Sequence, residues 1–300
     1  MKKTAFTFAV LAVFAFMFFA GCTATSPAEP DLPADTVKER FFYVSDEGTG
    51  SRDIACMNYD GTGNTIAAYG TGVIYLAGKV TDSGKVYYTR GGENKLYEMD
   101  AVTFAAAEKP GFTSGYQEVS TCKSGMTAVF NLSSEIFKTS LSASSDINLT
   151  VTGSQYEYMP VISANGGKIL YLENNNIKTM NADGTGIVSL GPDITDGFVY
   201  SADWSPDGSK IAYILHNTDS SVYQIRVMNA DGTGDGMIYE NSAESFVLRW
   251  LWRSNVIVFD RYLPADTTTD IYSISPDGTG LNKLTDMPAG GTALLYVSIT

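Results

Sequence analysis

Four copies of Asp-Gly-Thr-Gly punctuate the chain, and an acidic residue in a glycine-rich loop could hold a calcium ion or a phosphate group. One copy places oxygen ligands at calcium-loop spacing, from Asn229 and Asp231 through Thr233 to Glu240 at the twelfth position. The same count in the other copies ends on a proline, a tyrosine and an aspartate, at positions 192, 69 and 286. Strand-like segments flank every copy, and no lysine follows the glycines as in a phosphate loop. We therefore expect tight turns and no metal or phosphate site.

Each letter of the repeated turn has a structural use. The aspartate accepts hydrogen bonds from backbone amides ahead of it, and the first glycine takes a positive φ. The threonine begins the next strand, and the second glycine allows the neighbouring hairpin to approach closely. A Ser-Pro-Asp-Gly turn at 205–208 is of the same kind. The predicted structural turn residues are Asp60, Gly61, Asp183, Gly184, Asp207, Gly208, Asp231, Gly232, Asp277 and Gly278.

The inventory of catalytic side chains is poor. His216 is the single histidine, so neither a two-histidine zinc motif nor a two-histidine iron site can be assembled within this chain. Cys56 and Cys122 have no CxxC partner, and we expect buried free thiols at both positions. Paired carboxylates remain open among 33 acidic residues. We expect a protein that is not an enzyme and needs no cofactor, with a carboxylate-dependent hydrolase or lyase as the less favoured alternative.

The first residues have the composition of a secretory leader. Residues 1–21 combine two lysines, an apolar run too short for a comfortable membrane span, and small residues at the end. The residues from Phe19 to Cys22 resemble the lipobox of bacterial lipoproteins, in which the cysteine sulfur receives a diacylglycerol. This resemblance implies lipidation of Cys22 and anchoring of the mature chain. Thr23, in place of an aspartate, favours the outer membrane, with the protein facing the periplasm or the cell surface.

Residues 22–39 are rich in proline, small and acidic residues, a composition that predicts a flexible linker. From residue 40 to residue 300 the composition is even, which predicts one folded domain. Loss of Lys2 and Lys3 with the leader takes the formal net charge from −13 to −15. A chain with this much negative charge repels the phosphate backbone of nucleic acids. We therefore expect no nucleic-acid partner.

The repeated turns set the architecture, because Asp60, Asp183, Asp231 and Asp277 are separated by 123, 48 and 46 residues. These separations fit a repeat of about 40–50 residues, with two drifted copies, and short alternating segments between turns predict strands. Six similar second strands follow, at 40–44, 85–89, 126–130, 168–172, 210–214 and 255–259. The first unit lacks an inner strand, and an extra apolar segment ends the chain at 292–300. We predict an all-β fold: a six-bladed β-propeller of four-stranded antiparallel blades, closed by the C-terminal strand.

The best-preserved repeat resembles a known family. WSPDGSKIAY, from Trp204 to Tyr213, and IRVMNADGTG, from Ile225 to Gly234, are similar to the TolB-type propeller repeat, which also occurs in relatives of prolyl oligopeptidase. The resemblance is strong at 197–239, good at 160–190 and 246–285, and weak at 72–155. It implies a six-bladed propeller in the cell envelope. Residues 23–40 leave no room for the family's N-terminal α/β domain. We therefore expect this chain to share the family's propeller fold but not a role in the Tol system.

Strand direction predicts where a partner binds. In a four-stranded meander, the first-to-second and third-to-fourth hairpins lie on one face, where the repeated turns gather. The second-to-third loops and the links between blades lie on the other face and are free to carry recognition. We expect this face to bind another envelope protein, or alternatively an extracellular peptide or glycan, with the protein acting as a monomer. The candidate binding residues are Arg90, Glu93, His216, Asp260, Arg261 and Tyr262.

Overall fold

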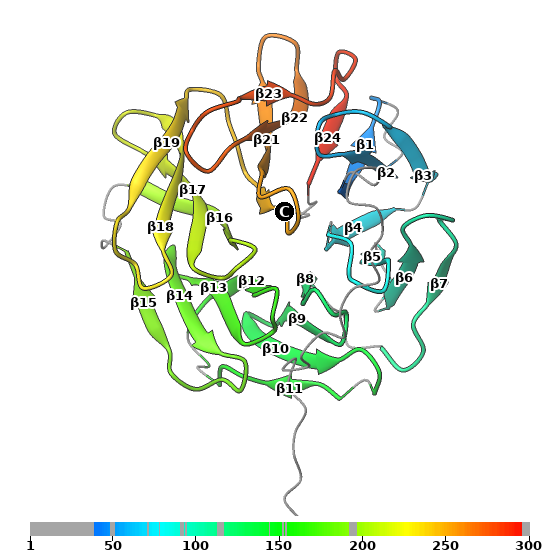
Figure 1. Cartoon of the computed structure of the whole chain (residues 1–300), viewed down its shortest axis with the longest axis vertical. Coiled ribbons are helices and arrows are strands. Elements are labelled where there is room, and N and C mark those ends of the chain that lie inside the picture. The colour runs from blue at the N-terminus through cyan, green and yellow to red at the C-terminus, as the bar shows by residue number, and fades with distance from the viewer. Residues whose placement is uncertain are drawn as a thin grey trace, which may run out of the picture.

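A closed ring of β-strands forms the molecule. The computed structural model describes residues 39–48, 52–70, 72–77, 79–90, 93, 95–112, 117–143, 145–151, 153, 155–191 and 197–295. Every regular element in these residues is a β-strand, and the strands form six antiparallel blades around a central channel (Figure 1). The predicted all-β six-bladed propeller is confirmed.

Each blade has four strands, which follow one another from the channel outward. Blade 1 contains β24 (Thr292–Leu294), β1 (Arg40–Asp46), β2 (Asp53–Asn58) and β3 (Thr65–Ala68). Blade 2 contains β4 (Val73–Leu76), β5 (Lys85–Arg90), β6 (Leu96–Asp100) and β7 (Ala106–Glu108). Blade 3 contains β8 (Gln117–Thr121), β9 (Thr127–Leu132), β10 (Glu135–Ser140) and β11 (Ile147–Asn148).

The second half of the chain repeats this order. Blade 4 contains β12 (Glu157–Ile162), β13 (Lys168–Glu173), β14 (Asn176–Asn181) and β15 (Val188–Leu190). Blade 5 contains β16 (Gly197–Trp204), β17 (Lys210–Asn217), β18 (Val222–Asn229) and β19 (Gly236–Asn241). Blade 6 contains β20 (Leu248–Trp250), β21 (Ile257–Leu263), β22 (Thr268–Ile274) and β23 (Asn282–Lys283).

The hydrophobic core is divided among the blades. Because side chains alternate along a strand, Ile211 and Tyr213 of β17 pack toward blade 4, while Ala212 and Ile214 pack toward blade 6. Both sides of the second strand are therefore buried, which explains its continuous apolar sequence. The buried apolar residues of the described chain form six clusters, one at each interface between neighbouring blades.

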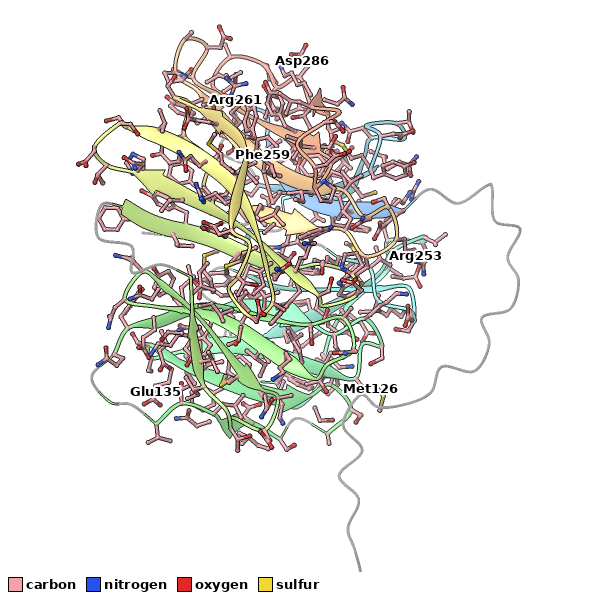
Figure 2. The ribbon with its side chains drawn as sticks, turned by 60° about the vertical axis from the view of Figure 1, so that its left-hand side comes forward. Met126, Glu135, Arg253, Phe259, Arg261 and Asp286 are labelled. Atoms are coloured by element: carbon pink, nitrogen blue, oxygen red, sulfur yellow. The ribbon has the colours of Figure 1, made fainter. Side chains whose placement is uncertain are left out.

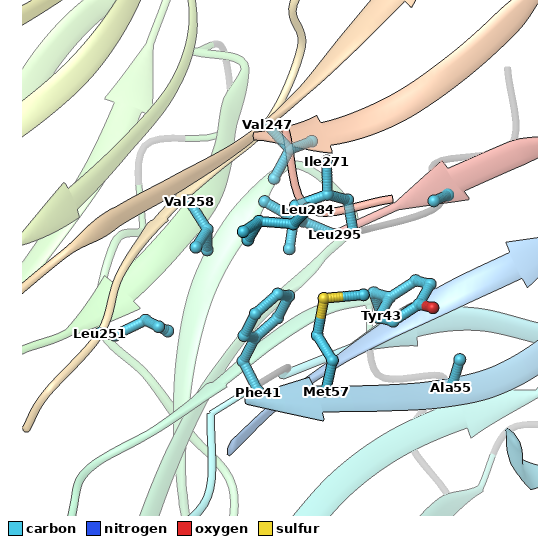
Figure 3. Close-up of a cluster of buried hydrophobic side chains, with 11 residues drawn as sticks. Phe41, Tyr43, Ala55, Met57, Val247, Leu251, Val258, Ile271, Leu284 and Leu295 are labelled. Atoms are coloured by element: carbon cyan, nitrogen blue, oxygen red, sulfur yellow. The ribbon is translucent and has the colours of Figure 1, made fainter. Parts of the chain in front are cut away.

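The ring closes between blades 6 and 1, as predicted. β24 pairs antiparallel with β1, with Val44 opposite Leu294 and Asp46 opposite Thr292. Thr292 also pairs with Thr269 of β22, so the two blades share one continuous sheet. The buried cluster at this seam contains residues of both blades, from Phe41 and Met57 to Val258 and Leu295 (Figure 3). The last strand of the chain thus supplies the inner strand of the first blade.

A second contact spans the same seam through Glu39, which precedes β1. Its carboxylate accepts hydrogen bonds from the backbone N–H groups of Trp252, Arg253 and Ser254, at 2.7–2.9 Å, and from the Ser254 hydroxyl at 2.9 Å. Its carbonyl oxygen accepts the N–H of Tyr59 in blade 1. Three successive amides aimed at one point form a concave anion site, and this one is filled by the protein's own carboxylate.

The two faces of the ring differ in their connections. The turn face carries the first-to-second and third-to-fourth hairpins, and the loop face carries the second-to-third connections and the links between blades. A side view shows Met126 and Arg253, both in first-to-second hairpins, on one side of the ring (Figure 2). Glu135, at the beginning of a third strand, lies on the other side (Figure 2).

In each repeated turn, the aspartate and the first glycine have the structural roles predicted for them. Oδ1 of Asp231 accepts hydrogen bonds from the N–H and the hydroxyl of Thr233, at 3.0 and 2.6 Å, and Asp60, Asp183 and Asp277 do the same for their threonines. These bonds lower the pKa of Asp231. The first glycines have φ between +84° and +87°.

Two predicted roles within the turn are wrong. The threonine does not begin a strand, because Thr62 lies three residues before β3 and is held in the turn by Asp60. It is the first glycine, not the second, that meets the neighbouring blade. A Cβ on Gly278 would lie 2.7 Å from the carbonyl oxygen of Ile238, in the preceding blade. The second glycine is enclosed by its own turn, since a Cβ on Gly234 would lie 2.9 Å from Asn229.

Candidate functional site

The candidate binding residues lie on three blades and do not form one site. Arg90 and Glu93 belong to blade 2, His216 to blade 5, and Asp260, Arg261 and Tyr262 to blade 6. Only Glu93 lies outside a strand, because β17 extends to Asn217 and β21 extends to Leu263. The prediction that the others lie in irregular loops is therefore wrong, and the physical reason is continued pairing, as between Tyr262 and Thr269.

Arg90 and Glu93 hold the hairpin of blade 2. The guanidinium of Arg90 lies 4.3 Å from the ring centre of Tyr97, which stacks on Tyr88 at 5.3 Å. The hydroxyl of Tyr97 donates a hydrogen bond to Glu93. These contacts join the end of β5 to the beginning of β6, so both charged side chains support the local structure.

Asp260 is a buried structural carboxylate, with 1% of its surface exposed. Its Oδ1 accepts the N–H groups of Phe246 and Val247, at 2.8 and 2.9 Å, which fastens β21 to the segment that enters β20. Burial raises the pKa of Asp260 to about 6, although these hydrogen bonds and the charge of Arg249 lower it. The prediction of Asp260 as a loop residue that meets a partner is corrected by this burial. Its neighbour Arg261 lies over the ring of Tyr272 at 5.4 Å.

His216 is part of a group of rings. Its imidazole stacks on Tyr223, with ring centres 4.4 Å apart, and lies 6.1 Å from Tyr200. Tyr200 in turn meets Phe246 edge to face at 5.3 Å. On blade 4, Tyr158 lies 5.1 Å from Tyr156, and it is near enough to Tyr200 for that group to raise its pKa. These rings come from the loop-face ends of strands and from the segment before β20.

We call this surface the aromatic patch and define it by its six rings, which are those of Tyr156, Tyr158, Phe198, Tyr200, His216 and Phe246. Tyr156 is 62% exposed and Phe198 is 45% exposed. Sequence reasoning found only His216 among them. The available signal was the aromatic residues at the beginnings of the inner strands of blades 4 and 5, in QYEY and GFVY.

A small cavity lies in the central channel beside the patch. Met159 and Ser201, which directly follow Tyr158 and Tyr200, are in its wall. The inner strands of blades 2 to 6 or their flanking residues supply the lining, which consists of Ala77, Lys79, Glu118, Val119, Ser120, Met159, Pro160, Val161, Ser201, Ala202 and Arg249. The wall is thus mixed, with six apolar residues, three charged residues and two serines.

An ion pair bridges the channel near the turn face. Lys79 Nζ lies 2.8 and 2.6 Å from the two carboxylate oxygens of Asp203, and both side chains are buried. Lys79 follows the inner strand of blade 2, and Asp203 lies near the end of the inner strand of blade 5, which faces it across the ring (Figure 1). Asp203 also accepts the N–H groups of Trp204 and Trp250, each at 2.8 Å. The bridge gives the cavity a floor, so the cavity lies on its loop-face side.

The described residues contain no group of three or more histidine, cysteine or acidic side chains arranged to hold a metal ion. Glu118 on the cavity wall accepts the N–H of Met159 at 2.5 Å, and both oxygens of Asp203 are already engaged. Cys56 and Cys122 are free and buried. The site therefore consists of aromatic rings beside a small cavity whose wall carries both apolar and charged side chains.

The architecture and this site define a six-bladed β-propeller with a cavity on one side of its channel. Among solved structures, TolB from Acinetobacter baumannii matches with a TM-score of 0.68 and 15% identity, covering 85% of this chain and 66% of that one. A chain of a nidogen/laminin complex matches at 0.64 and 13%, covering 86% of this chain and 99% of that one. Oligogalacturonate lyase from Vibrio parahaemolyticus matches at 0.57 and 13%, covering 82% and 74%.

No family model and no curated protein matches the sequence. The structural likenesses show a TolB-like propeller fold. Cys22 and the leader lie outside the described residues. Within the part of the chain that the structure describes, no helix is long and apolar enough to cross a membrane.

Proposed function

We propose that this protein is a lipid-anchored binding protein of the cell envelope, which engages another protein through its loop face. The observation that carries the proposal is the aromatic patch beside the cavity. Exposed tyrosine and phenylalanine side chains next to a pocket are typical of the residues that dominate protein interfaces. The leader and the lipobox-like sequence ending at Cys22 support the anchored location.

The similar structures fit this proposal without deciding it. Two are named as TolB and as a nidogen/laminin complex, and the second name describes a complex of two proteins. The third is an enzyme, a lyase. We propose binding over catalysis because the single histidine of this chain is stacked on Tyr223 and the buried carboxylate of Asp203 is fully engaged.

Glycan binding is the second candidate, and one observation favours it. Side-chain amides border the patch on blade 4, where the hydroxyl of Tyr158 donates to Asn175 Oδ1 at 3.1 Å and Asn174 donates to Gln155. Rings beside amide groups can stack on a sugar and bond its hydroxyls. A neutral oligosaccharide is therefore a reasonable competitor for the same surface.

Site-specific photo-crosslinking in membranes of the native host tests the protein-binding proposal. A benzophenone amino acid at Phe198 should form a covalent adduct with one specific protein, identified by mass spectrometry. The same group at Val102, which is 78% exposed on the turn face, is the matched control and should not give that adduct. A Cys22→Ser variant should leave the membrane fraction. Adducts with glycan alone, or the same protein from both positions, would contradict the proposal.

A further inference from the structure

We propose that the first-to-second hairpin of blade 6, at residues 252–254, is a binding site for a carboxylate, and that its present ligand, Glu39, exchanges with a glutamate on an extended segment of a partner protein. This inference goes beyond the proposed function, because the hairpin lies on the turn face and does not involve the aromatic patch. Three features carry it: the source of the carboxylate, the donors that receive it, and the place of Glu39 at the edge of the fold.

The hairpin of blade 6 differs from its counterparts in the source of its acceptor. In blade 5, Asp207 accepts the N–H group of Ser209, so the hairpin contains its own acceptor, and Asn165 has the same role in blade 4. Arg253 occupies the corresponding position in blade 6, because each hairpin begins two residues earlier with an N–H group that bonds to the residue five positions on. Its side chain has only donors. The acceptor therefore comes from Glu39, which is 214 residues away in the chain.

The donors of the hairpin match both oxygens of a carboxylate. One oxygen of Glu39 accepts the N–H group of Trp252 at 2.9 Å. The other accepts the N–H groups of Arg253 and Ser254, at 2.9 and 2.7 Å, and the hydroxyl of Ser254 at 2.9 Å. A carboxamide has only one oxygen, and its NH₂ group would face donors. Hydrogen bonds to a charged oxygen are also roughly twice as strong as those between neutral groups, so the site selects a carboxylate.

The position of Glu39 allows exchange. It lies directly before β1 and is half-buried, and Arg253 is exposed, so the site is open to solvent. Blades 6 and 1 are also joined by β24 and by the seam cluster, so the ring has a second closure that remains when the carboxylate leaves. The neighbours of the site in the chain are cationic, with Arg253 in the hairpin and Arg40 next to Glu39. The bound ligand is itself a glutamate that leads into an extended strand, which is the form we expect of its replacement.

Chemical rescue of Glu39→Ala in the full mature chain in detergent tests the carboxylate site. The probe is propionate, which has the structure of the end of a glutamate side chain. The variant should unfold several degrees below the wild type, because three amides lose a charged acceptor. Sodium propionate should restore about half of that loss or more, and sodium chloride of equal ionic strength should not. Glu39→Gln is the matched control, because its side chain still fills the site and propionate should leave its midpoint unchanged.

Peptide binding tests the chemistry of the partner and the exchange. The probes are blocked tripeptides with glutamate or glutamine between two alanines, and the readout is the NMR shift of the N–H groups of Arg253 and Ser254. On Glu39→Ala, the glutamate peptide should bind about tenfold or more tightly than the glutamine peptide. Adding Ser254→Ala should weaken it several-fold, because one donor is lost. The wild type should bind the same peptide more weakly but measurably, since the peptide competes with Glu39.

Each contrary outcome overturns a stated part of the inference. Equal effects of propionate and chloride on Glu39→Ala, or equal stabilisation of Glu39→Gln by propionate, would remove the carboxylate site. A wild type that shows no shift with excess glutamate peptide would show that Glu39 does not exchange. If Glu39→Ala does not fold in chloride, refolding from urea decides: recovery in propionate supports the site, and no recovery in either salt contradicts it. The crosslink at Phe198 is independent of these results.

Discussion

Single carboxylates fasten this ring, two of them between blades and one within blade 6. Asp203 holds Lys79 and two backbone amides, Asp260 holds the two amides before β20, and Glu39 holds three amides of blade 6. Burial raises the pKa of Asp260 to about 6. In an unfolded chain an aspartate has a pKa near 3.9. At a pH between these two pKa values, the native state therefore keeps a proton on Asp260 that the unfolded state has lost.

The free energy of unfolding should therefore depend on pH through Asp260. Between about pH 4 and pH 6 the native state binds more protons at this residue, so stability falls as pH rises, by about 2–3 kcal/mol in total. Asp260→Asn removes the titration but keeps an oxygen for the amides of Phe246 and Val247. Urea unfolding of both proteins from pH 4 to pH 7 should show the wild type losing that amount relative to the variant. Parallel stability curves would contradict a raised pKa.

At the scale of residues, the sequence predicts contacts between near neighbours in the chain but not contacts between blades. The turn aspartates were predictable because their partners, such as Thr233 for Asp231, lie two residues away. Lys79 and Asp203 are 124 residues apart and meet only because blades 2 and 5 face each other across the ring. No local pattern reports such a pairing. The same reason hid the aromatic patch, whose rings come from separate blades.

At the scale of elements, the repeated turn is also a contact between blades. The first glycine of each Asp-Gly-Thr-Gly turn abuts the outer part of the preceding blade, at Leu284, Leu149, Gly191 and Ile238 in turn. A side chain there would both strain the backbone at positive φ and push the blades apart. The second strands were predictable from their continuous apolar sequences, but the ends of β17 and β21 were not, because polar residues such as Asn217 still pair in the ladder.

Two glycine variants separate the backbone strain at positive φ from the contact between blades. Gly278→Ala introduces a Cβ 2.7 Å from a backbone oxygen at φ +84°, and we expect a loss of about 3 kcal/mol. Gly208→Ala has a similar φ of +71° with no atom within 4 Å of the new Cβ, so only backbone strain of about 1 kcal/mol remains. Equilibrium denaturation in urea measures both losses. Equal losses would show that contact between blades adds nothing to the cost.

At the scale of the whole molecule, the ring depends on a strand from the far end of the chain. The sequence predicted this closure by counting, since the first blade lacked a strand and the last segment supplied one. β24 contributes only three paired residues, but one of them, Ala293, and the following residue, Leu295, are fully buried in the seam cluster. Without β24 the inner edge of β1 is left unpaired, which invites association through that edge.

A chain ending at residue 291 should therefore unfold at least about 10 °C below the full chain, because it loses several kcal/mol of burial and pairing. Leu295→Ala keeps the strand and should fall between the two. Scanning calorimetry measures the midpoints, and light scattering after size exclusion should reveal dimers of the truncated chain alone. An unchanged midpoint after truncation would show that the seam is held without β24.

Under the proposed lipid anchor at Cys22, the Glu39 contact would have a mechanical role. The chain enters the ring beside blade 6, where four hydrogen bonds grip one carboxylate immediately before β1 begins. A pull on the preceding residues is shared between blades 1 and 6 before it reaches the pairing of β1 with β2. The contact that would resist such a pull thus lies at the seam between blades 6 and 1, on the turn face. The loop face would not be under tension.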